Sequence, residues 1–385
     1  MTDKLRAVLT GGGTGGHVFP ALAAARQLRE TIAGVELLWI GQAASLEQRT
    51  AAGDSIEFTS VQVGKIRRSR NPLAMLNRAN VIDMVRVPVG AVQAVRALSR
   101  FKPDVVLATG GFVAVPVGLA ARLLRIPLVV HEQTVGLGLA NRVLAKVATA
   151  VALTSQESIE ELPSRARARA VVTGNPIRAA IMDGDPARAL SEFGRDFDPL
   201  LPTVYITGGA QGSQQINDVV AELLEWMLVR ANVIHQAGPA NVDELHRAAA
   251  SLPDQLAARY QVVGFVSGDS VADVLALADV VISRSGAGTL AELTAVGRPA
   301  LLLPLASSAG GEQATAAQLM ARADAAVTVD GPITTETVQA GLEVLLSDPA
   351  RRRGIAANAA ALGRPDAAKA LAGVVTAAAS GRASS

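Results

Sequence analysis

The 385-residue sequence contains no cysteine, and aromatic residues make up only 3% of it. The absence of cysteine excludes disulfides and thiol catalysis and fits a reducing compartment. With so few aromatic side chains, stacking platforms for nucleic-acid bases are scarce, and a net charge of +2 is too small to indicate nucleic-acid binding. We therefore expect no nucleic-acid partner.

The sequence also lacks an apolar run long enough to cross a membrane. Its longest weakly polar stretch, Gly111–Leu124, contains Pro116 and Arg122 and falls short of the roughly 20 residues that span a bilayer. The apolar stretch near the N-terminus is shorter than a signal-peptide core. With 50% hydrophobic residues, however, the chain can build a sizeable core and split into two domains. We expect a globular cytoplasmic protein.

The stretch Leu5–Pro20 organises the rest of the chain. A short apolar run predicts a buried strand, and five glycines around Thr14 separate it from His17 and a helical pattern, Ala21–Glu30. Glycine lets the backbone approach a ligand closely, and the free N–H groups of a helix start attract anions. The stretch indicates a phosphate or sugar site, with a tight structural turn as the alternative.

Gly11, Gly13 and Gly16 also satisfy the dinucleotide fingerprint G-x-G-x-x-G. That fingerprint needs an acidic residue at the end of the next strand, about 20 residues on, to hold the ribose. The next predicted strand, Val35–Ile40, is followed by Gly41-Gln42 and no carboxylate. We therefore disfavour a nicotinamide or flavin oxidoreductase.

Short β-rich runs alternate with helical patterns in both halves of the chain, which predicts two Rossmann-like α/β domains with parallel sheets, facing each other across a cleft. The strands expected after the first two are Asp104–Thr109, Leu128–His131, Ala148–Leu153, Ala170–Val172, Val204–Thr207, Asn232–His235, Gln261–Gly264, Val280–Ser283, Ala300–Leu303 and Ala326–Val329. Turn chemistry makes Thr173–Arg178 a plausible hinge, and Asp183–Pro202 is predicted to be linker and surface loop. We expect domains at residues 1–177 and 178–363, a final helix within 364–379 and a disordered tail, 380–385.

The second half repeats the strand, glycine loop and helix arrangement. Gly208–Gly212 follows one predicted strand, and Arg284–Thr289 follows another and leads into a helix that carries Glu292. Free N–H groups there would face a phosphate while the Glu292 carboxylate takes both hydroxyls of a ribose, although an acid near a helix start is often only solvated.

Several polar groups invite catalytic or metal interpretations. His17 could act as a general base or could be only a hydrogen-bonding group, and spacing alone does not separate the two. A zinc motif built on His131-Glu132 fails because Val135 stands where the second histidine is needed. Asp183 and Asp185 could hold a metal that bridges a diphosphate, but a polar turn explains them better.

The segment Lys65–Arg86 carries six cationic residues interleaved with apolar ones. Cations beside exposed apolar groups suit an anionic membrane surface. An ordinary basic surface helix is the alternative.

The sequence resembles a known family through an ordered set of motifs that covers nearly the whole chain. The motifs are Gly12-Gly13-Thr14-Gly15-Gly16-His17, Lys102-Pro103-Asp104-Val105-Val106, Gly110-Gly111-Phe112, His131-Glu132-Gln133, Gly174-Asn175-Pro176-Ile177-Arg178, Gln211-Gly212 and Arg284-Ser285-Gly286-Ala287. In this order they resemble the bacterial N-acetylglucosaminyltransferases of peptidoglycan synthesis, the MurG family.

This resemblance implies a two-domain GT-B fold whose final helix crosses back to the N-terminal domain. It also implies transfer of N-acetylglucosamine from UDP-N-acetylglucosamine to the 4-hydroxyl of undecaprenyl-diphospho-N-acetylmuramoyl-pentapeptide (lipid I), with inversion and without an essential metal or other cofactor. The product would be lipid II. The protein would lie on the cytoplasmic face of the cell membrane, held there by the Lys65–Arg86 segment, with cell-wall synthesis proteins as possible partners.

The resemblance also implies roles for individual residues. His17 is the expected base, with Glu132 second. The expected donor-binding residues are Thr14, Gly15, Gly16, Asn141, Arg178, Gly209, Ala210, Gln211, Gly212, Phe265, Arg284, Gly286, Ala287, Gly288, Thr289, Glu292 and Gln313. The expected acceptor-binding residues are Gly12, Gly13, Gly110, Gly111, His131 and Gln133.

The chain departs from the family's usual pattern near the expected substrates. Thr134, Ala210 and Ala316 stand where the family usually has Asn, Ser and Asn, and the loop Leu305–Gly311 is longer and plainer than usual. Losing a polar contact to a substrate can cost about 1–3 kcal/mol. The alternatives are another UDP-sugar enzyme of this fold, such as an epimerase or a natural-product glycosyltransferase, and a weakly active or non-catalytic UDP-sugar-binding homologue.

Overall fold

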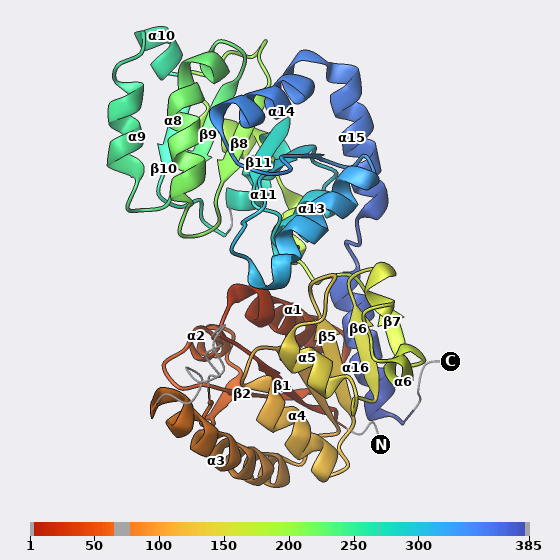
Figure 1. The fold of residues 1–385 in the computed structure, drawn as a ribbon. Coiled ribbons are helices and arrows are strands. Elements are labelled where there is room, and N and C mark those ends of the chain that lie inside the picture. The colour runs from red at the N-terminus through yellow and green to blue at the C-terminus, as the bar shows by residue number, and fades with distance from the viewer. Residues whose placement is uncertain (1–3, 65–77, 269, 382–385) are drawn as a thin grey trace. The chain divides into compact units, whose positions relative to one another are not determined.

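The computed structural model describes residues 4–64, 78–268 and 270–381 (Figure 1). The chain divides into two compact units. The first comprises Met1–Ile177 together with Asp366–Ser385, and the second comprises Arg178–Pro365. Each unit is built around one parallel sheet.

The sheet of the first unit has seven strands in the order β3-β2-β1-β4-β5-β6-β7. Its strands are β1 (Arg6–Gly11), β2 (Glu36–Gly41), β3 (Glu57–Ser60), β4 (Val105–Gly110), β5 (Leu128–Glu132), β6 (Ala150–Leu153) and β7 (Ala170–Val172). Its helices are α1 (Gly15–Thr31), α2 (Leu46–Gly53), α3 (Arg78–Phe101), α4 (Ala114–Leu123), α5 (Leu139–Leu144), α6 (Ser164–Arg167) and α16 (Ala367–Ala379), and Glu157–Ile159 forms a 3-10 turn.

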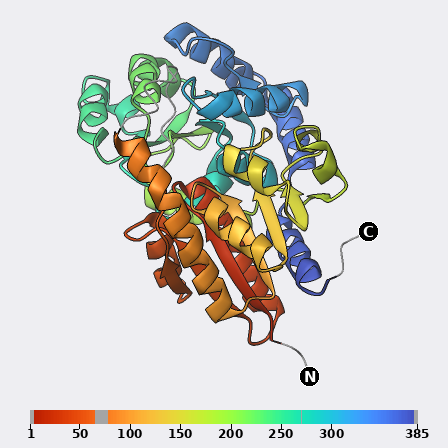
Figure 2. The same cartoon turned by 60° about the horizontal axis from the view of Figure 1, so that its bottom comes forward.

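Two apolar cores lie on opposite faces of this sheet, because successive side chains of a strand point to opposite sides. Val8 and Val106 belong to the core that includes residues of α3, α4 and α5. Leu9 and Leu107 belong to the other core, which includes residues of α1 and α16. Helices on both faces explain why the central strands are almost continuously apolar. In Figure 2 the orange α3 runs beside α4 on the first of these faces.

The last helix of the chain completes the first unit. Leu371 and Val375 of α16 are fully buried and share a core with Trp39 and with Leu28 of α1. In Figure 1 the blue α16 lies beside β6, in agreement with its contacts to β4, β5, β6 and α1.

The sheet of the second unit has six strands in the order β10-β9-β8-β11-β12-β13. They are β8 (Thr203–Thr207), β9 (Asn232–Gln236), β10 (Tyr260–Val263), β11 (Val280–Ser283), β12 (Ala300–Leu302) and β13 (Val327–Thr328). The helices are α7 (Pro186–Phe193), α8 (Gln214–Leu228), α9 (Val242–Ala249), α10 (Asp254–Ala257), α11 (Ser270–Leu277), α12 (Ala287–Ala295), α13 (Glu312–Arg322), α14 (Thr335–Ser347) and α15 (Pro349–Leu362), with 3-10 turns at Ala179–Asp183 and Ala309–Gly311.

The stretch Asp183–Pro202 is not the linker and loop that its prolines and aspartates indicated. It contains α7, because Pro186 stands at the start of the helix, where its missing N–H costs nothing. The Asp185 side chain accepts the Ala187 N–H as an N-cap. Asp185 is therefore a capping residue, and the backbone N–H of Asp185 is itself bound by Asp273.

Three further expectations need comment. The edge strand β3 was missed, because Glu57–Ser60 is half exposed and has no apolar run. The first two residues of the expected disordered tail are ordered, since the N–H groups of Ser380 and Gly381 bond the end of α16, whereas residues 382–385 lie outside the described residues. Residues 65–77 of the basic segment also lie outside them, and its remainder begins α3. No helix in the described ranges is long and apolar enough to cross a membrane.

Candidate functional site

Each sheet has one point at which the strand order reverses, and the glycine loops follow strands at those points. In the first unit β1 lies between β2 and β4, and in the second β8 lies between β9 and β11. In open parallel sheets, ligands bind beyond the carboxyl ends of the strands at such switch points. The loops after β1, β4, β8 and β11 are therefore the places at which to look for a site.

The first glycine loop connects β1 to α1. Gly13 has φ +88° and no atom within 4 Å of where a Cβ would stand, so open space rather than packing surrounds it. Thr14 is the N-cap of α1, its side chain makes no capping bond, and it is exposed. Helix α1 thus begins at Gly15, inside the glycine run, and the N–H groups of its first turn face outward from the sheet end.

His17 lies in the first turn of α1 and is held from three sides. Its Nδ1 is 3.0 Å from Oε1 of Gln133. Its backbone carbonyl accepts a 2.6 Å hydrogen bond from the Thr109 hydroxyl. A Cβ at Gly110, which has φ +109°, would lie 2.8 Å from the same ring nitrogen, so only glycine fits beside the imidazole. His17 is half-buried.

Glu132, at the end of β5, is 2% exposed and already engaged. Its carboxylate accepts hydrogen bonds from the Thr134 N–H and hydroxyl, the Gly138 N–H and Nδ2 of Asn141. Asn141 is itself 1% exposed and also donates to the backbone carbonyl of His131. The Glu132 carboxylate therefore fixes the loop between β5 and α5.

His131 is fully buried, and burial lowers its pKa to about 4, so the ring is neutral near pH 7. Its Nε2 is 3.1 Å from the carbonyl oxygen of Gly174. A carbonyl only accepts, so Nε2 carries the proton. Gly111, with φ +80°, follows β4 and packs so closely on Gly12 that a Cβ would lie 2.3 Å from the Gly12 carbonyl oxygen.

The second glycine loop joins β8 to α8. A Cβ at Gly212 would lie 1.8 Å from the Ala237 carbonyl oxygen, so packing requires glycine there. Gly209, with φ +91°, has open space instead. Within the described part of the chain, the N–H groups of Ala210 and Gln211 have no protein acceptor. They are available to an anion together with the first N–H groups of α8.

The loop after β11 has the same character. Helix α12 begins at Ala287 after Gly286, and Gly288 has no atom within 4 Å of the position that a Cβ would take. The N–H groups of Ala287, Gly288 and Thr289 lie in the first turn, where a helix offers no intrahelical acceptor. Open space at Gly288 lets a ligand approach these groups.

Arg178 and Glu292 form an ion pair beside this loop. Nη2 of Arg178 is 3.0 Å from Oε1 of Glu292, and its Nη1 donates to the Gly268 carbonyl. Burial raises the pKa of the Glu292 carboxyl, and the Arg178 charge opposes that effect. The pair places one cation and one carboxylate together near the end of α12.

The side chains of Arg284 and Gln313 connect neighbouring loops through hydrogen bonds. The Arg284 guanidinium bonds the Leu303 carbonyl, the Ser213 hydroxyl and Oε1 of Gln215, and burial lowers its pKa. Oε1 of Gln313 accepts the Leu305 N–H, which holds the loop after β12. Phe265, after β10, is 56% exposed.

The expected site residues thus fall into two groups. The structure places Gly12, Gly13, Thr14, Gly15, Gly16, His17, Gly110, Gly111, His131, Glu132, Gln133 and Asn141 at the carboxyl ends of β1, β4 and β5 in the first unit. It places Arg178, Gly209, Ala210, Gln211, Gly212, Phe265, Arg284, Gly286, Ala287, Gly288, Thr289, Glu292 and Gln313 in the second unit.

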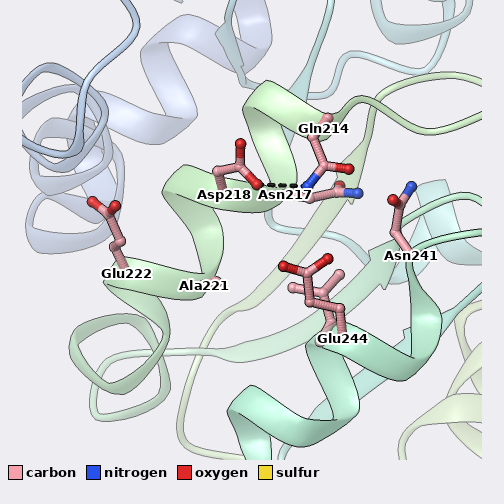
Figure 3. Close-up of a pocket in the computed structure, with 8 residues that line it drawn as sticks. Gln214, Asn217, Asp218, Ala221, Glu222, Asn241 and Glu244 are labelled. Carbon is pink, nitrogen blue, oxygen red and sulfur yellow. Dashed lines mark hydrogen bonds between the residues drawn. The ribbon is translucent and has the colours of Figure 1, made fainter.

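A hollow of about 310 Å³ lies between α8 and α9 (Figure 3). Asp218 and Glu222 of α8 line one side and Glu244 of α9 the other. Nε2 of Gln214 donates to Asp218 at 2.7 Å, as the dashed line shows. Three carboxylates repel a diphosphate, so this hollow does not suit the phosphate-binding role of the loops.

The comparisons with known proteins identify the family. The model of the glycosyltransferase family 28 N-terminal domain matches residues 7–153, and that of the family 28 C-terminal domain matches residues 203–371. The chain belongs to glycosyltransferase family 28. The two matched regions contain both glycine loops, His17 and Glu292.

Relatives in family 28 align over most of the chain. A protein of Treponema denticola named UDP-N-acetylglucosamine–N-acetylmuramyl-(pentapeptide) pyrophosphoryl-undecaprenol N-acetylglucosamine transferase is 35% identical over 80% of this chain and 79% of its own. A protein of the same name from Halothermothrix orenii is 33% identical over 94% of this chain and 95% of its own.

Solved structures have the same fold. MurG of Acinetobacter baumannii superposes with a TM-score of 0.76 at 26% identity, over 97% of this chain and 99% of that one. UDP-GlcNAc 2-epimerase from Neisseria meningitidis superposes with a TM-score of 0.66 at 16% identity, over 97% and 99% of the two chains. The second likeness shows the fold alone. The family 28 chain therefore has the GT-B fold, with two parallel-sheet domains.

Sequence reasoning missed two residues at these loops. Glu47 of α2 is 1% exposed, accepts the Gln42 N–H, and lies where a Cβ at Gly12 would meet it at 2.4 Å. A carboxylate therefore does follow β2, although it is buried rather than presented to a ligand. Thr109 was the other, and its hydroxyl bond to His17 joins residues 92 positions apart, which no local pattern reveals.

Proposed function

We propose that this family 28 chain transfers N-acetylglucosamine from UDP-N-acetylglucosamine to the 4-hydroxyl of lipid I, with inversion at the anomeric carbon. The observation that carries the proposal is the chain's identity of 33–35% to two transferases of that name over 80–94% of its length. The geometry supports it, since both switch points carry open glycine loops with free N–H groups, as a diphosphate-linked donor and acceptor require.

The second unit supplies the donor contacts in this proposal. The N–H groups after β8 and β11 and the Arg178 guanidinium receive the diphosphate, and the Glu292 carboxylate accepts the ribose hydroxyls. Charge grows on the leaving diphosphate as the glycosidic bond breaks, and preorganised N–H groups and a cation stabilise that charge most where it develops. We therefore expect transfer to proceed in the presence of a chelator.

The first unit supplies the base. A single displacement requires one proton to leave the attacking 4-hydroxyl as its oxygen bonds the anomeric carbon. Among the described residues, Nε2 of His17 has no hydrogen-bond partner, whereas the Glu132 carboxylate accepts four hydrogen bonds from its own loop. Of the two candidates, His17 is the one whose basic atom is available, so we assign the proton to His17 and loop positioning to Glu132.

The test is transfer of labelled N-acetylglucosamine to a short-chain lipid I analogue, in chelator, with UDP-glucose in a parallel reaction. Selective transfer from UDP-N-acetylglucosamine supports the proposal, and His17→Ala should then lower kcat by roughly 10²–10⁴-fold. Binding of the donor without transfer would favour a non-catalytic homologue. Conversion of the donor to its 2-epimer would instead favour an epimerase of the same fold.

We also propose that the first unit docks on the membrane through the face covered by α3, α4 and α5. Large apolar side chains are exposed there on neighbouring helices, namely Val92 on α3, Leu119 and Leu123 on α4, and Leu139 and Val143 on α5. Exposed cations flank them: Arg96, Arg122, Arg125, Arg142 and Lys146. Apolar groups ringed by cations suit an anionic lipid surface, where a lipid-linked acceptor resides.

Co-sedimentation with vesicles tests this docking face. Leu123, which is 73% exposed, is replaced by Asp, and Leu200 in the second unit, 90% exposed, is replaced likewise as the control. We expect Leu123→Asp alone to weaken binding to vesicles that contain phosphatidylglycerol. Equal binding of both variants and the parent would refute the assignment of this face.

A further inference from the structure

Gln133, which the family resemblance assigns to acceptor binding, lies between two histidines just after β5. Its Oε1 faces one partner, and the two N–H groups of its Nε2 are shared among three acceptors. The residue is 4% exposed. The directions of these bonds determine which nitrogen of each histidine carries a proton.

The orientation of the Gln133 amide follows from its surroundings. Its Nε2 lies 2.8 Å from the Thr109 carbonyl oxygen and 3.1 Å from the His131 carbonyl oxygen. Carbonyl oxygens only accept, so the amide nitrogen must face them and Oε1 must point the other way, toward His17. Nε2 is also 3.0 Å from Nδ1 of His131, which is free to accept because that ring donates to Gly174 from Nε2.

The consequence for His17 is fixed by the same rule. Oε1 of Gln133 can only accept, so Nδ1 of His17 carries its proton and donates it across 3.0 Å. Neutral imidazole has one N–H, so Nε2 of His17 keeps its lone pair. In water the neutral histidine side chain favours the opposite tautomer, with the proton on Nε2. In that tautomer Nε2 has no lone pair with which to accept a proton from a hydroxyl.

We propose that Gln133 is a positioning residue that holds His17 in the Nδ1–H tautomer and so keeps Nε2 as the proton acceptor of the transfer reaction. The carbonyl oxygens of Thr109 and His131 fix the orientation of the Gln133 amide by accepting hydrogen bonds from its Nε2. Gly110 assists, because the glycine leaves the imidazole room to lie against the turn after β4. This inference rests on the proposed role of His17 as the base.

The first test is nitrogen-15 NMR of the full chain labelled at histidine. The chain has four histidines, and His17→Ala identifies the signals of His17. We expect His17 to carry its proton on Nδ1 at a pH where the ring is neutral. A proton on Nε2 of His17 in the parent protein would overturn the inference without any variant of Gln133.

The second test replaces Gln133 with Met, which keeps the length of the side chain and removes its hydrogen bonds. We expect His17 to shift toward the Nε2–H tautomer. The value of kcat should fall by up to about tenfold, which is part of the roughly 10²–10⁴-fold that a general base supplies. The KM for UDP-N-acetylglucosamine should change by less than about twofold. A folded Gln133→Met protein with the parent's tautomer and kcat would overturn the proposal.

Asn232→Leu serves as the matched control. Asn232 is a buried amide at the amino end of β9, where it makes three hydrogen bonds to the segment Asp198–Leu201. It should lose stability as Gln133→Met does but keep both the His17 tautomer and kcat. If the parent shows the expected tautomer yet transfers no sugar, the proposed function fails while the positioning by Gln133 stands. If the parent transfers sugar but His17 carries its proton on Nε2, the positioning role of Gln133 fails while the proposed function stands.

Discussion

Replacement of Glu292 by Gln tests the donor site most directly. In the structure this carboxylate is 22% exposed and is paired with Arg178 at 3.0 Å. The glutamine has nearly the same shape and keeps one oxygen acceptor, but it loses the negative charge and the second acceptor. The change therefore removes a charge-assisted contact to the ribose and leaves the backbone of α12 in place.

The expected size follows from the value of such a contact. A hydrogen bond to a charged group contributes about 1.5–3 kcal/mol, so KM for UDP-N-acetylglucosamine should rise roughly 10- to 150-fold. The ribose is remote from the bond that breaks, so its contact contributes equally to the ground state and the transition state, and kcat should change little.

The pH dependence adds a second signature. Burial raises the pKa of Glu292, so on acidification the folded parent loses this carboxylate at a higher pH than an unperturbed glutamate would. Donor affinity should therefore begin to weaken at a correspondingly higher pH in the parent. The Gln variant has no carboxylate at this position, and this component of the pH profile should be absent from it.

The assay is initial-rate transfer at varied donor concentration, with Asp324→Asn as the control. Asp324 is also a carboxylate of the second unit that is paired with an arginine, Arg351, but its side chain is 47% exposed and lies after α13. Its replacement should leave KM unchanged. An unchanged KM in Glu292→Gln, or an equal rise in both variants, would refute the assignment of Glu292 to the ribose.

Three further outcomes are expected. Gly110→Ala forces a Cβ to 2.8 Å from Nδ1 of His17 at φ +109°, so kcat should fall with little change in donor KM, as transfer kinetics will show. In Gly288→Ala the new Cβ contacts no protein atom and alanine favours a helix, so the free energy of unfolding should rise by about 0.5–1 kcal/mol and the melting temperature with it. The KM for the donor should also rise, because the Cβ occupies the open space through which a ligand approaches. The pKa of His131 is about 4 in the folded protein and 6.5 in the unfolded chain, so the unfolded chain binds the proton first on acidification. The free energy of unfolding therefore falls as the pH drops from about 6.5 to 4, and the loss is ~2 kcal/mol at pH 5. Urea unfolding at pH 7 and pH 5 should show a smaller loss in His131→Asn than in the exposed control His246→Asn.

The apolar runs, together with the glycines and prolines between them, predicted every strand of the two sheets except β3. Buried parallel strands have continuous apolar runs such as Val105–Ala108, and these are visible in one dimension. The half-exposed edge strand Glu57–Ser60 has no such run, and Pro186 was interpreted as a breaker although it begins a helix. The strand was missed because it lacks an apolar run, and the helix was missed because proline occurs both in loops and at the first position of a helix.

The site was only partly predictable for a different reason. Glycine loops, His17 and Glu292 stand beside strand ends and can be found locally. The hydrogen bond between His17 and Gln133 joins residues 116 positions apart, and its direction depends on the Thr109 carbonyl, which every sequence possesses. Backbone groups have no letter in a sequence, so a tautomer that they impose becomes visible only in three dimensions.

The return of α16 to the first unit has a consequence for biosynthesis. The residues that fill one of that unit's two cores, Leu371 and Val375 among them, are synthesised nearly 200 residues after Ile177, with the entire second unit between them. On the ribosome the second unit can complete its fold first, while the first waits with part of its core uncovered. A nonsense mutation just before the codons of α16 would therefore damage the first unit, which holds His17, rather than the second unit, whose codons directly precede it.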